Sequence, residues 1–311
     1  MAATRGRRPS VSAPLDQQSR PARAAQRERW ARQPGLGALG LLLVLPVALL
    51  LALAAGGPEP SLLVLAPLVT YGLPVVAMVA FWWDDWPGST LRASWSGWAD
   101  TVLVIVAAVG LTLLGQAVVD TVDVRAVLVL GRLLAGPDLG ALLTLIGAGQ
   151  VGVYVLGRGW PVARSGRRAV RLVVGNVLVL GAAGLAYAVT RGVDPGAVSA
   201  AAGCVVAAGL LYGMLFEGFL RDRLPAATER AVLVGLTSVT AVVLDLALGG
   251  YAGTVAWTRG TPDDWVTHAS LNALGVGVIL HVAIGRRWPF GRPAPAAVSA
   301  VEPAQQGLRS A

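Results

Sequence analysis

The chain has 311 residues, of which 55% are hydrophobic and only 14% are charged, and its mean hydropathy is +0.65. A soluble globular protein carries about 25% charged residues, so these figures exclude a soluble domain of ordinary composition. All 25 basic residues are arginine and the net charge is +8. A nucleic-acid-binding protein would need such residues clustered on a soluble surface. The composition therefore predicts a polytopic membrane protein, with the lipid bilayer as its partner and no nucleic acid.

Both ends of the chain read as disordered tails. Residues 1–35 are rich in Arg, Pro, Ala and Ser and lack a periodic apolar pattern, so they cannot bury enough surface to fold. Eight arginines in this tail favour association with anionic lipid at the cytoplasmic face of a membrane. Residues 286–311, rich in Pro and Ala, form the second tail.

Residues 36–285 form the predicted transmembrane bundle. A helix needs roughly 20 apolar residues to cross a bilayer. Eight blocks approach this length: 36–55, 61–83, 101–119, 139–157, 172–190, 197–219, 231–250 and 268–285. A shorter block, 126–135, carries Arg132 and is interpreted as a re-entrant or interfacial half-helix. The fold class predicted is all-α, a polytopic transmembrane helical bundle with about eight spans plus this half-helix.

The distribution of arginine predicts the orientation. If the N-terminus is cytoplasmic and the loops alternate, 21 of the 25 arginines lie on the cytoplasmic side. Cytoplasmic loops of membrane proteins carry such an excess. We therefore expect both termini in the cytoplasm and the protein in the plasma membrane.

A few ionisable residues lie inside the predicted spans, where charge is costly and a function is the default hypothesis. They are Glu217, Asp245, His268 and His281, with Asn272, Asn176, Gln116 and Gln150 as uncharged companions. Hydrogen bonding between helices is the alternative role for the same residues. The single cysteine, Cys204, lies in an apolar stretch and is expected to be a small buried hydrophobe.

A G-x-G-x-x-G pattern at Gly147–Gly152 matches the dinucleotide-binding fingerprint. That fingerprint requires a preceding strand, whereas this match lies inside a predicted span. Close packing of helices through small residues explains it better. We expect no cofactor and no metal site.

Two motifs in residues 210–285 resemble a family of intramembrane proteases. Glu217-Gly-Phe-Leu-Arg221 reads as E-x-x-x-R and His268-Ala-Ser-Leu-Asn272 reads as H-x-x-x-N. They resemble the first and last motifs of the CAAX-protease and bacteriocin-processing (CPBP) family, in which paired glutamates and two histidines form the catalytic site. Phe216 stands where the first glutamate of the pair belongs, and no F-x-x-x-H follows. The resemblance thus implies a diverged and inactive metalloprotease.

The last 80 residues show a second resemblance. Phe216-Glu-Gly218, Leu271-Asn-Ala-Leu-Gly275, His281 and Arg287-Trp-Pro-Phe290 are similar to segments of uncharacterised multi-pass proteins of actinobacterial type. This resemblance implies no activity.

Depth along the helices arranges the polar residues in two layers. At 1.5 Å per residue, Glu217, His281 and Asn176 lie near the cytoplasmic boundary, with Gln150 slightly deeper. Asp245, Asn272 and Gln116 lie about 20–24 Å above that boundary, with His268 just beyond them. We predict that Asp245 faces the last helix near Asn272 and that Glu217 approaches His281. The layers are either gates on a proton or solute path or hydrogen-bonded belts. These alternatives predict a small-solute or proton-coupled carrier or a membrane scaffold, with the diverged protease as the competing hypothesis.

Overall fold

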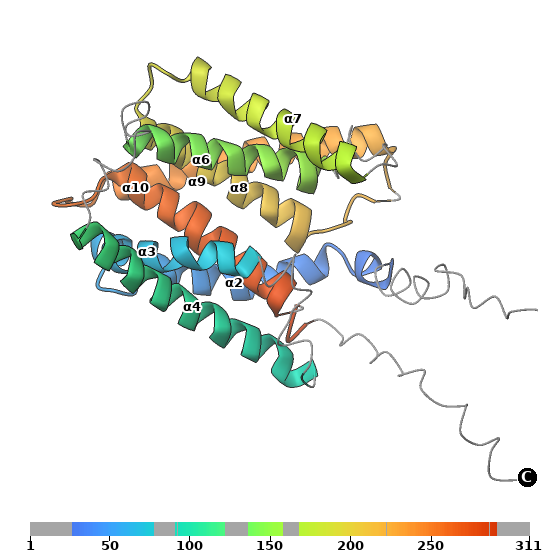
Figure 1. The fold of residues 1–311 in the computed structure, drawn as a ribbon. Helices are drawn as coiled ribbons and strands as arrows, with labels where there is room; N and C mark the ends of the chain where they lie inside the picture. The colour runs from blue at the N-terminus through green and yellow to red at the C-terminus, as the bar shows by residue number, and fades with distance from the viewer. Residues whose placement is uncertain are drawn as a thin grey trace, which may run out of the picture.

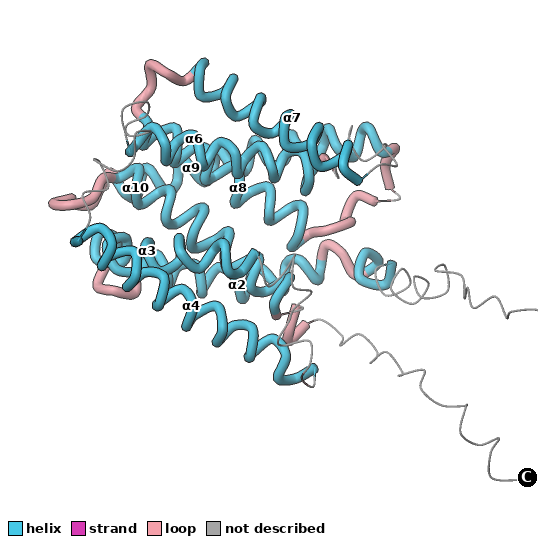
Figure 2. Tube along the Cα trace, in the orientation of Figure 1, coloured by secondary structure: helices cyan, strands magenta, loops and turns pink. Residues whose placement is uncertain are grey.

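A computed structural model describes residues 27–77, 91, 93–121, 136–157, 168–221, 223–285 and 287–290. These residues form only helices, turns and short loops (Figure 2). The predicted all-α class is therefore confirmed. The expected half-helix at 126–135 lies outside the described residues.

Each of the eight predicted apolar blocks falls mainly within one helical segment of the described chain. Some segments contain wider, π-helical turns, which are labelled η. In chain order the segments are α2 (Gly35–Leu53), α3 (Pro58–Ala77), α4 (Ala93–Thr121), α6 (Gly136–Gln150), η4 (Val151–Leu156), α7 (Arg168–Val189), α8 (Pro195–Leu210), η6 (Leu211–Leu215), α9 (Ala226–Ala252), α10 (Pro262–Thr267), η7 (His268–Gly275), α11 (Val276–Ile279) and η8 (Leu280–Ile284). The last four form one continuous run, Pro262–Ile284, called here the C-terminal helix.

Side-chain caps define where two of these helices begin. The carboxylate of Asp194 accepts a hydrogen bond from the backbone N–H of Ala197 (3.1 Å) at the start of α8. The hydroxyl of Thr261 accepts one from the N–H of Asp264 (3.2 Å) at the start of the C-terminal helix. Proline follows each cap residue, at a position where its missing N–H costs nothing. The sequence therefore starts both helices by local chemistry.

The helices lie side by side with alternating direction, as Figure 1 shows. The helix formed by α8 and η6 and the C-terminal helix are the most buried of the long apolar helices. Helices α6, α9 and α10 pack against α8, while α2 packs on η7 and α7 on α6. The core of the bundle is therefore built around these two helices.

Small residues let α2 approach its neighbours closely. Its buried stripe consists of Leu36, Gly37, Gly40, Val44, Ala48 and Ala52. A Cβ at Gly40 would lie 2.9 Å from Nε2 of His281, and one at Gly37 would overlap the ring of Phe216. Close approach through small residues is the usual way in which helices pack in membranes.

The outward faces of the helices are strongly apolar. Exposed side chains follow one another along whole helices; examples are Leu42, Leu49, Val106, Leu113, Val177, Leu185, Val239 and Leu246. Soluble monomers rarely expose contiguous apolar patches larger than a few hundred Å². Five helices are also long and apolar enough to cross a bilayer: Gly35–Leu53, the Gly97–Leu114 part of α4, Pro195–Leu215, Ala226–Ala252 and Pro262–Ile284. Length and composition thus indicate a membrane protein.

The expected tail boundaries need correction. Residues 27–31 are helical, and Gln33 is 4% exposed, although both were assigned to the disordered tail. Residues 287–290 likewise form a turn whose Arg287 is 4% exposed. Hydrogen bonds and ring contacts with residues that are distant in sequence hold these short segments, so composition does not reveal them. Residues 1–26 and 291–311 lie outside the described part.

Candidate functional site

Three segments far apart in sequence meet at one end of the bundle. They are residues 27–33 before α2, residues 216–221 and 223 after η6, and residues 285 and 287–290 after the C-terminal helix. This region is called here the arginine-rich end. Arg32 donates a hydrogen bond to the carbonyl oxygen of Phe290 (3.1 Å), and Arg223 donates a long one to that of Gln33 (3.5 Å). The N-terminal segment is thus tied to both other segments.

Arg287 occupies the centre of this end. Its guanidinium donates to the carbonyl oxygens of Leu215 (2.8 Å) and Met214, which close the last turn of η6. The carboxylate of Glu217 lies 3.7 Å away. Burial lowers the pKa of the Arg287 guanidinium, and the charge of Glu217 opposes that change. Arg287 therefore caps η6 with a buried positive charge, as cations do at helix C-termini.

Gln33 completes the cap from the other side. Its side-chain amide donates to the carbonyl oxygen of Leu215 (3.0 Å) and accepts from the backbone N–H of Gly37 (3.0 Å). The carbonyl of Leu215 thus accepts two hydrogen bonds from residues that are distant in sequence. Gln33 and Arg287 together lock the start of α2 and the end of the C-terminal helix onto η6.

His281 lies next to this cap. It is 6% exposed, its ring packs edge-on against Phe290 with centroids 6.3 Å apart, and its carbonyl accepts from the N–H of Arg287 (2.8 Å). Its buried Nδ1 has no hydrogen-bond partner among the described residues. Glu217 and His281 were predicted to pair directly; the ion pair that the structure gives for Glu217 is with Arg287, which touches His281.

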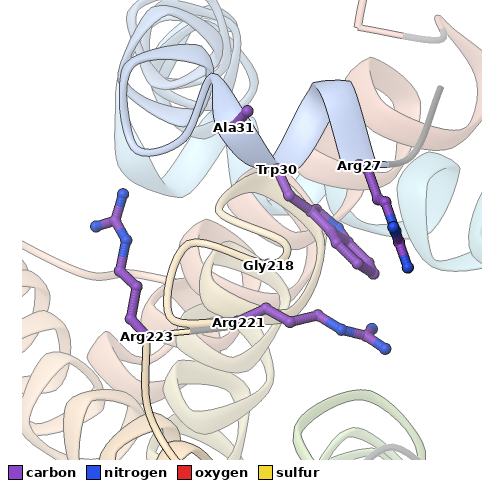
Figure 3. Close-up of a pocket in the computed structure, with 6 residues that line it drawn as sticks. All are labelled: Arg27, Trp30, Ala31, Gly218, Arg221 and Arg223. Atoms are coloured by element: carbon purple, nitrogen blue, oxygen red, sulfur yellow. The ribbon is translucent and has the colours of Figure 1, made fainter. Parts of the chain in front are cut away.

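Arg221, the last residue of the E-x-x-x-R motif, contacts the N-terminal segment. Its guanidinium lies 4.0 Å from the ring centroid of Trp30, a cation–π contact. Gly218, with φ +80°, makes the turn that brings them together, and a Cβ there would overlap the Trp30 indole. Figure 3 shows Trp30 beside this turn.

The second predicted layer contains Asp245 of α9. Its Oδ1 lies 4.0 Å from Sγ of Cys204 on α8. Cys204 of α8 is therefore the contact that the structure gives Asp245, whereas the prediction was a position facing the last helix near Asn272. Asn272, the predicted partner, is buried in η7. Cys204 is fully buried, as expected, yet it has a polar neighbour in Asp245.

His268 lies at the far end of the C-terminal helix. It is 1% exposed, and its Nε2 is 3.2 Å from the carbonyl oxygen of Leu51 near the end of α2. Nearby, the indole N–H of Trp265 donates to the carbonyl of Ala52 (3.0 Å). The Nδ1 atom of His268 is buried without a hydrogen-bond partner among the described residues. Each layer thus contains one buried imidazole.

Two uncharged residues were expected in the polar layers but do not belong to them. The side chains of Asn176 on α7 and Gln150 on α6 are exposed. Both were placed by depth alone, and depth does not fix which face of a helix a residue occupies. The side chain of Gln116 lies outside the described part of the structure.

Sequence reasoning missed several buried polar residues, among them Gln33, Asp100 and Arg287. Gln33 and Arg287 were assigned to the tails, and Asp100, which is 1% exposed in α4, was assigned to a loop just before a predicted span. The signal for Asp100 was an acidic residue directly before an apolar run. The signal for Arg287 was its place immediately after the last span.

The structure does not bring Glu217 and His268 together. The part of the C-terminal helix from His268 to Ile284, before the turn at Arg287, is roughly 20–24 Å long. Glu217 lies beside Arg287, at the opposite end from His268. Among the described residues, no group of three or more His, Cys, Asp or Glu side chains is placed to hold a metal ion.

No protein-family model, curated protein or solved structure matches the chain. The resemblances found in the sequence therefore stay predictions.

Proposed function

We propose that the protein is a multi-pass protein of the plasma membrane whose eight helical segments all cross the bilayer, with both termini in the cytoplasm. Besides the five long helices, three shorter apolar stretches lie within α3, α6–η4 and α7, and the alternating direction of the helices is consistent with spans. The orientation rests on charge. The described arginines crowd at the arginine-rich end, whereas Arg191 and Arg259 are in loops at the other.

We further propose that it is a proton-coupled carrier of a small solute. The observation that carries this proposal is a buried imidazole in each polar layer, His268 and His281, each with an Nδ1 that has no partner among the described residues. Leaving a buried polar atom without a partner costs about 1–3 kcal/mol. A belt serving only to join helices would satisfy its polar atoms, whereas a proton path uses groups that exchange partners.

Asp245 supports the same function in the layer of His268. Its carboxylate lies among the central helices, beside the thiol of Cys204. A carboxylate within a bundle marks a proton or ion path more often than a structural contact.

A membrane scaffold is the second candidate. The small-residue stripe of α2 and the cap formed by Gln33 and Arg287 support a rigid bundle. The third candidate, a diverged CPBP-like metalloprotease, is disfavoured because Glu217 and His268 lie at opposite ends of the C-terminal helix.

The test is proton flux in proteoliposomes that contain a pH-sensitive dye. With an imposed pH gradient, a panel of sugars, amino acids and small organic ions is added one at a time. We expect at least one solute to accelerate the loss of the gradient. Asp245→Asn should abolish that acceleration while the protein keeps its unfolding temperature, since the amide still forms hydrogen bonds.

The matched control is Asn176→Ala, because its side chain is exposed on α7 and belongs to neither layer. It should transport as the parent protein does. If folded protein accelerates proton flux with no solute in the panel, or if Asp245→Asn transports normally, the carrier proposal fails and the scaffold becomes the better interpretation.

A further inference from the structure

A hollow at the arginine-rich end is not used by the proposed carrier. It has a volume of about 550 Å³ and is lined by Arg27, Trp30, Ala31, Gly218, Arg221 and Arg223. Figure 3 shows that its walls come from the helical turn before α2 and from the loop after η6. Three of its six lining residues are cationic, and no carboxylate of a described residue lines it.

Two described carboxylates, Glu28 and Glu217, lie next to these walls in sequence, and neither lines the hollow; Asp222, between Arg221 and Arg223, lies outside the described residues. Glu217 lies next to Gly218 but is 3.7 Å from Arg287, outside the hollow. Glu28 lies next to Arg27 and is exposed, and it is not a lining residue. The positive charge of the hollow is therefore not neutralised by its described lining.

The walls are held in place by contacts behind them. Gly218, at φ +80°, lets Trp30 pack on the loop, and the buried Gln33 fixes the N-terminal segment to the carbonyl of Leu215. The guanidinium carbon of Arg221 lies 4.0 Å from the centroid of the Trp30 ring, within the distance for stacking. Stacking uses the face and leaves the N–H groups at the edge of the plane free to donate.

The side chains of Arg27 and Arg221 extend from the two walls toward the same side of Trp30 in Figure 3, and Arg223 lies on the other side of the loop. Two guanidinium groups beside an aromatic ring suit a phosphate group, because planar N–H pairs match phosphate oxygens. The hollow also lies just before α2, a candidate span, at the level where lipid headgroups would surround the bundle.

We propose that this hollow is a binding site for a phosphate group, with Arg27 and Arg221 as its principal ligands and Arg223 as a supporting charge. A phospholipid headgroup and a soluble phosphate ester share this chemistry. The site does not depend on carrier activity. It differs from association of the whole N-terminal tail with anionic lipid because its described lining is six residues: Arg27, Trp30, Ala31, Gly218, Arg221 and Arg223.

The test uses the full chain in a zwitterionic detergent. Inorganic phosphate, a soluble phosphate monoester such as glycerol 3-phosphate, and short-chain phosphatidic acid are titrated separately. Short-chain phosphatidylcholine, whose phosphodiester is balanced by its choline cation, is the net-neutral comparison. The double variant Arg27→Gln/Arg221→Gln should bind at least about tenfold more weakly, since each basic residue contributes about fivefold to attraction of an anion. The control Arg191→Gln/Arg259→Gln removes the same charge from loops at the opposite end and should bind normally.

The probes distinguish a phospholipid headgroup from a soluble phosphate ester as the ligand. Tighter binding of phosphatidic acid than of either soluble phosphate identifies a lipid headgroup, and equal or tighter binding of the soluble probes identifies a free phosphate ester. The proposal is overturned if the parent protein binds no phosphate probe saturably. It is also overturned if both double variants lose binding equally, which would indicate only general electrostatic attraction.

A second measurement needs no variant. Phenylglyoxal modifies accessible arginine side chains, and mass spectrometry reports the sites. Saturating phosphate probe should protect Arg27 and Arg221 in the parent protein and leave Arg191 unprotected. Equal modification of Arg27 and Arg221 with and without the probe would contradict the site even if the double variant did not fold.

Discussion

At the scale of single residues, Arg287 joins more of the molecule than any residue that the sequence singled out. It adopts φ +62°, a left-handed conformation that costs a non-glycine residue about 1–2 kcal/mol. Its hydrogen bonds to two carbonyls of η6 and its ion pair with Glu217 offset that cost. One side chain thus fixes the end of the C-terminal helix against the end of η6.

Replacing Arg287 with alanine should therefore lower the free energy of unfolding by about 3 kcal/mol, because two buried carbonyls and Glu217 lose a charged partner. Arg287→Lys should recover part of this, since an ammonium keeps the charge but lacks the planar fork. Unfolding in detergent, followed by circular dichroism, measures both. Arg191→Ala, at an exposed position, should change stability by less than about 0.5 kcal/mol. Equal stability of Arg287→Ala and the parent would contradict the role of the cap.

At the scale of elements, Glu59 ties the first turn of α3 to the loop before the C-terminal helix. Its carboxylate accepts hydrogen bonds from the backbone N–H groups of Thr258 (2.8 Å), Arg259 and Gly260 (2.9 Å), and from the Thr258 hydroxyl (2.9 Å). These bonds lower the pKa of Glu59 from 4.5 to about 2, chiefly through the backbone N–H groups of Arg259 and Gly260. A single side chain thus holds a loop that is some 200 residues away in sequence.

Because the folded pKa lies below the unfolded one, Glu59 stabilises the protein fully above pH 4.5 and loses this contribution as the pH falls toward 2. Glu59→Gln should lower the unfolding temperature at pH 7, and the difference from the parent should shrink between pH 4.5 and 3. Thr258→Val removes one hydroxyl and leaves the backbone N–H groups, so it should have a smaller effect. A difference between Glu59→Gln and the parent that stays constant over this range would rule out the anchored carboxylate.

At the scale of the whole molecule, the ends of the bundle differ in charge, and this asymmetry sets the expected orientation. The arginine-rich end carries Arg27, Arg32, Arg221 and Arg287 among its described residues. A membrane protein retains such an end in the cytoplasm.

Single cysteines in a Cys204→Ala background test this orientation. Gly192→Cys and Ala256→Cys place an exposed thiol at the end away from the arginines, and Ala227→Cys places one at the arginine-rich end. In intact cells an impermeant maleimide should label the first two and spare the third. After the cells are lysed, all three should react. Labelling of Ala227→Cys in intact cells would show that the arginine-rich end faces outward and would contradict the expected orientation.

The sequence by itself determined the features that depend on local composition. The eight apolar blocks predicted the helices because the hydropathy and the length of a segment can be read from that segment alone. The local sequence also indicates where two helices begin, at Asp194-Pro195 and Thr261-Pro262, because a capping residue is followed directly by proline. Depth counting also separated Glu217 from His268, because the rise per residue of a helix is fixed.

Only the tertiary structure decided which side chains meet. Depth fixed the height of Asn176 but not its face, and its side chain is exposed. Asp245 contacts Cys204, and Glu217 is paired with Arg287, because rotation of each helix about its axis is set by packing between small residues such as Gly40 and their neighbours. Gln33 and Arg287 lie in segments of tail-like composition, and the hydrogen bonds that order them join residues 72 to 182 positions apart. No local pattern encodes such a pairing, because its free energy exists only once the helices have come together.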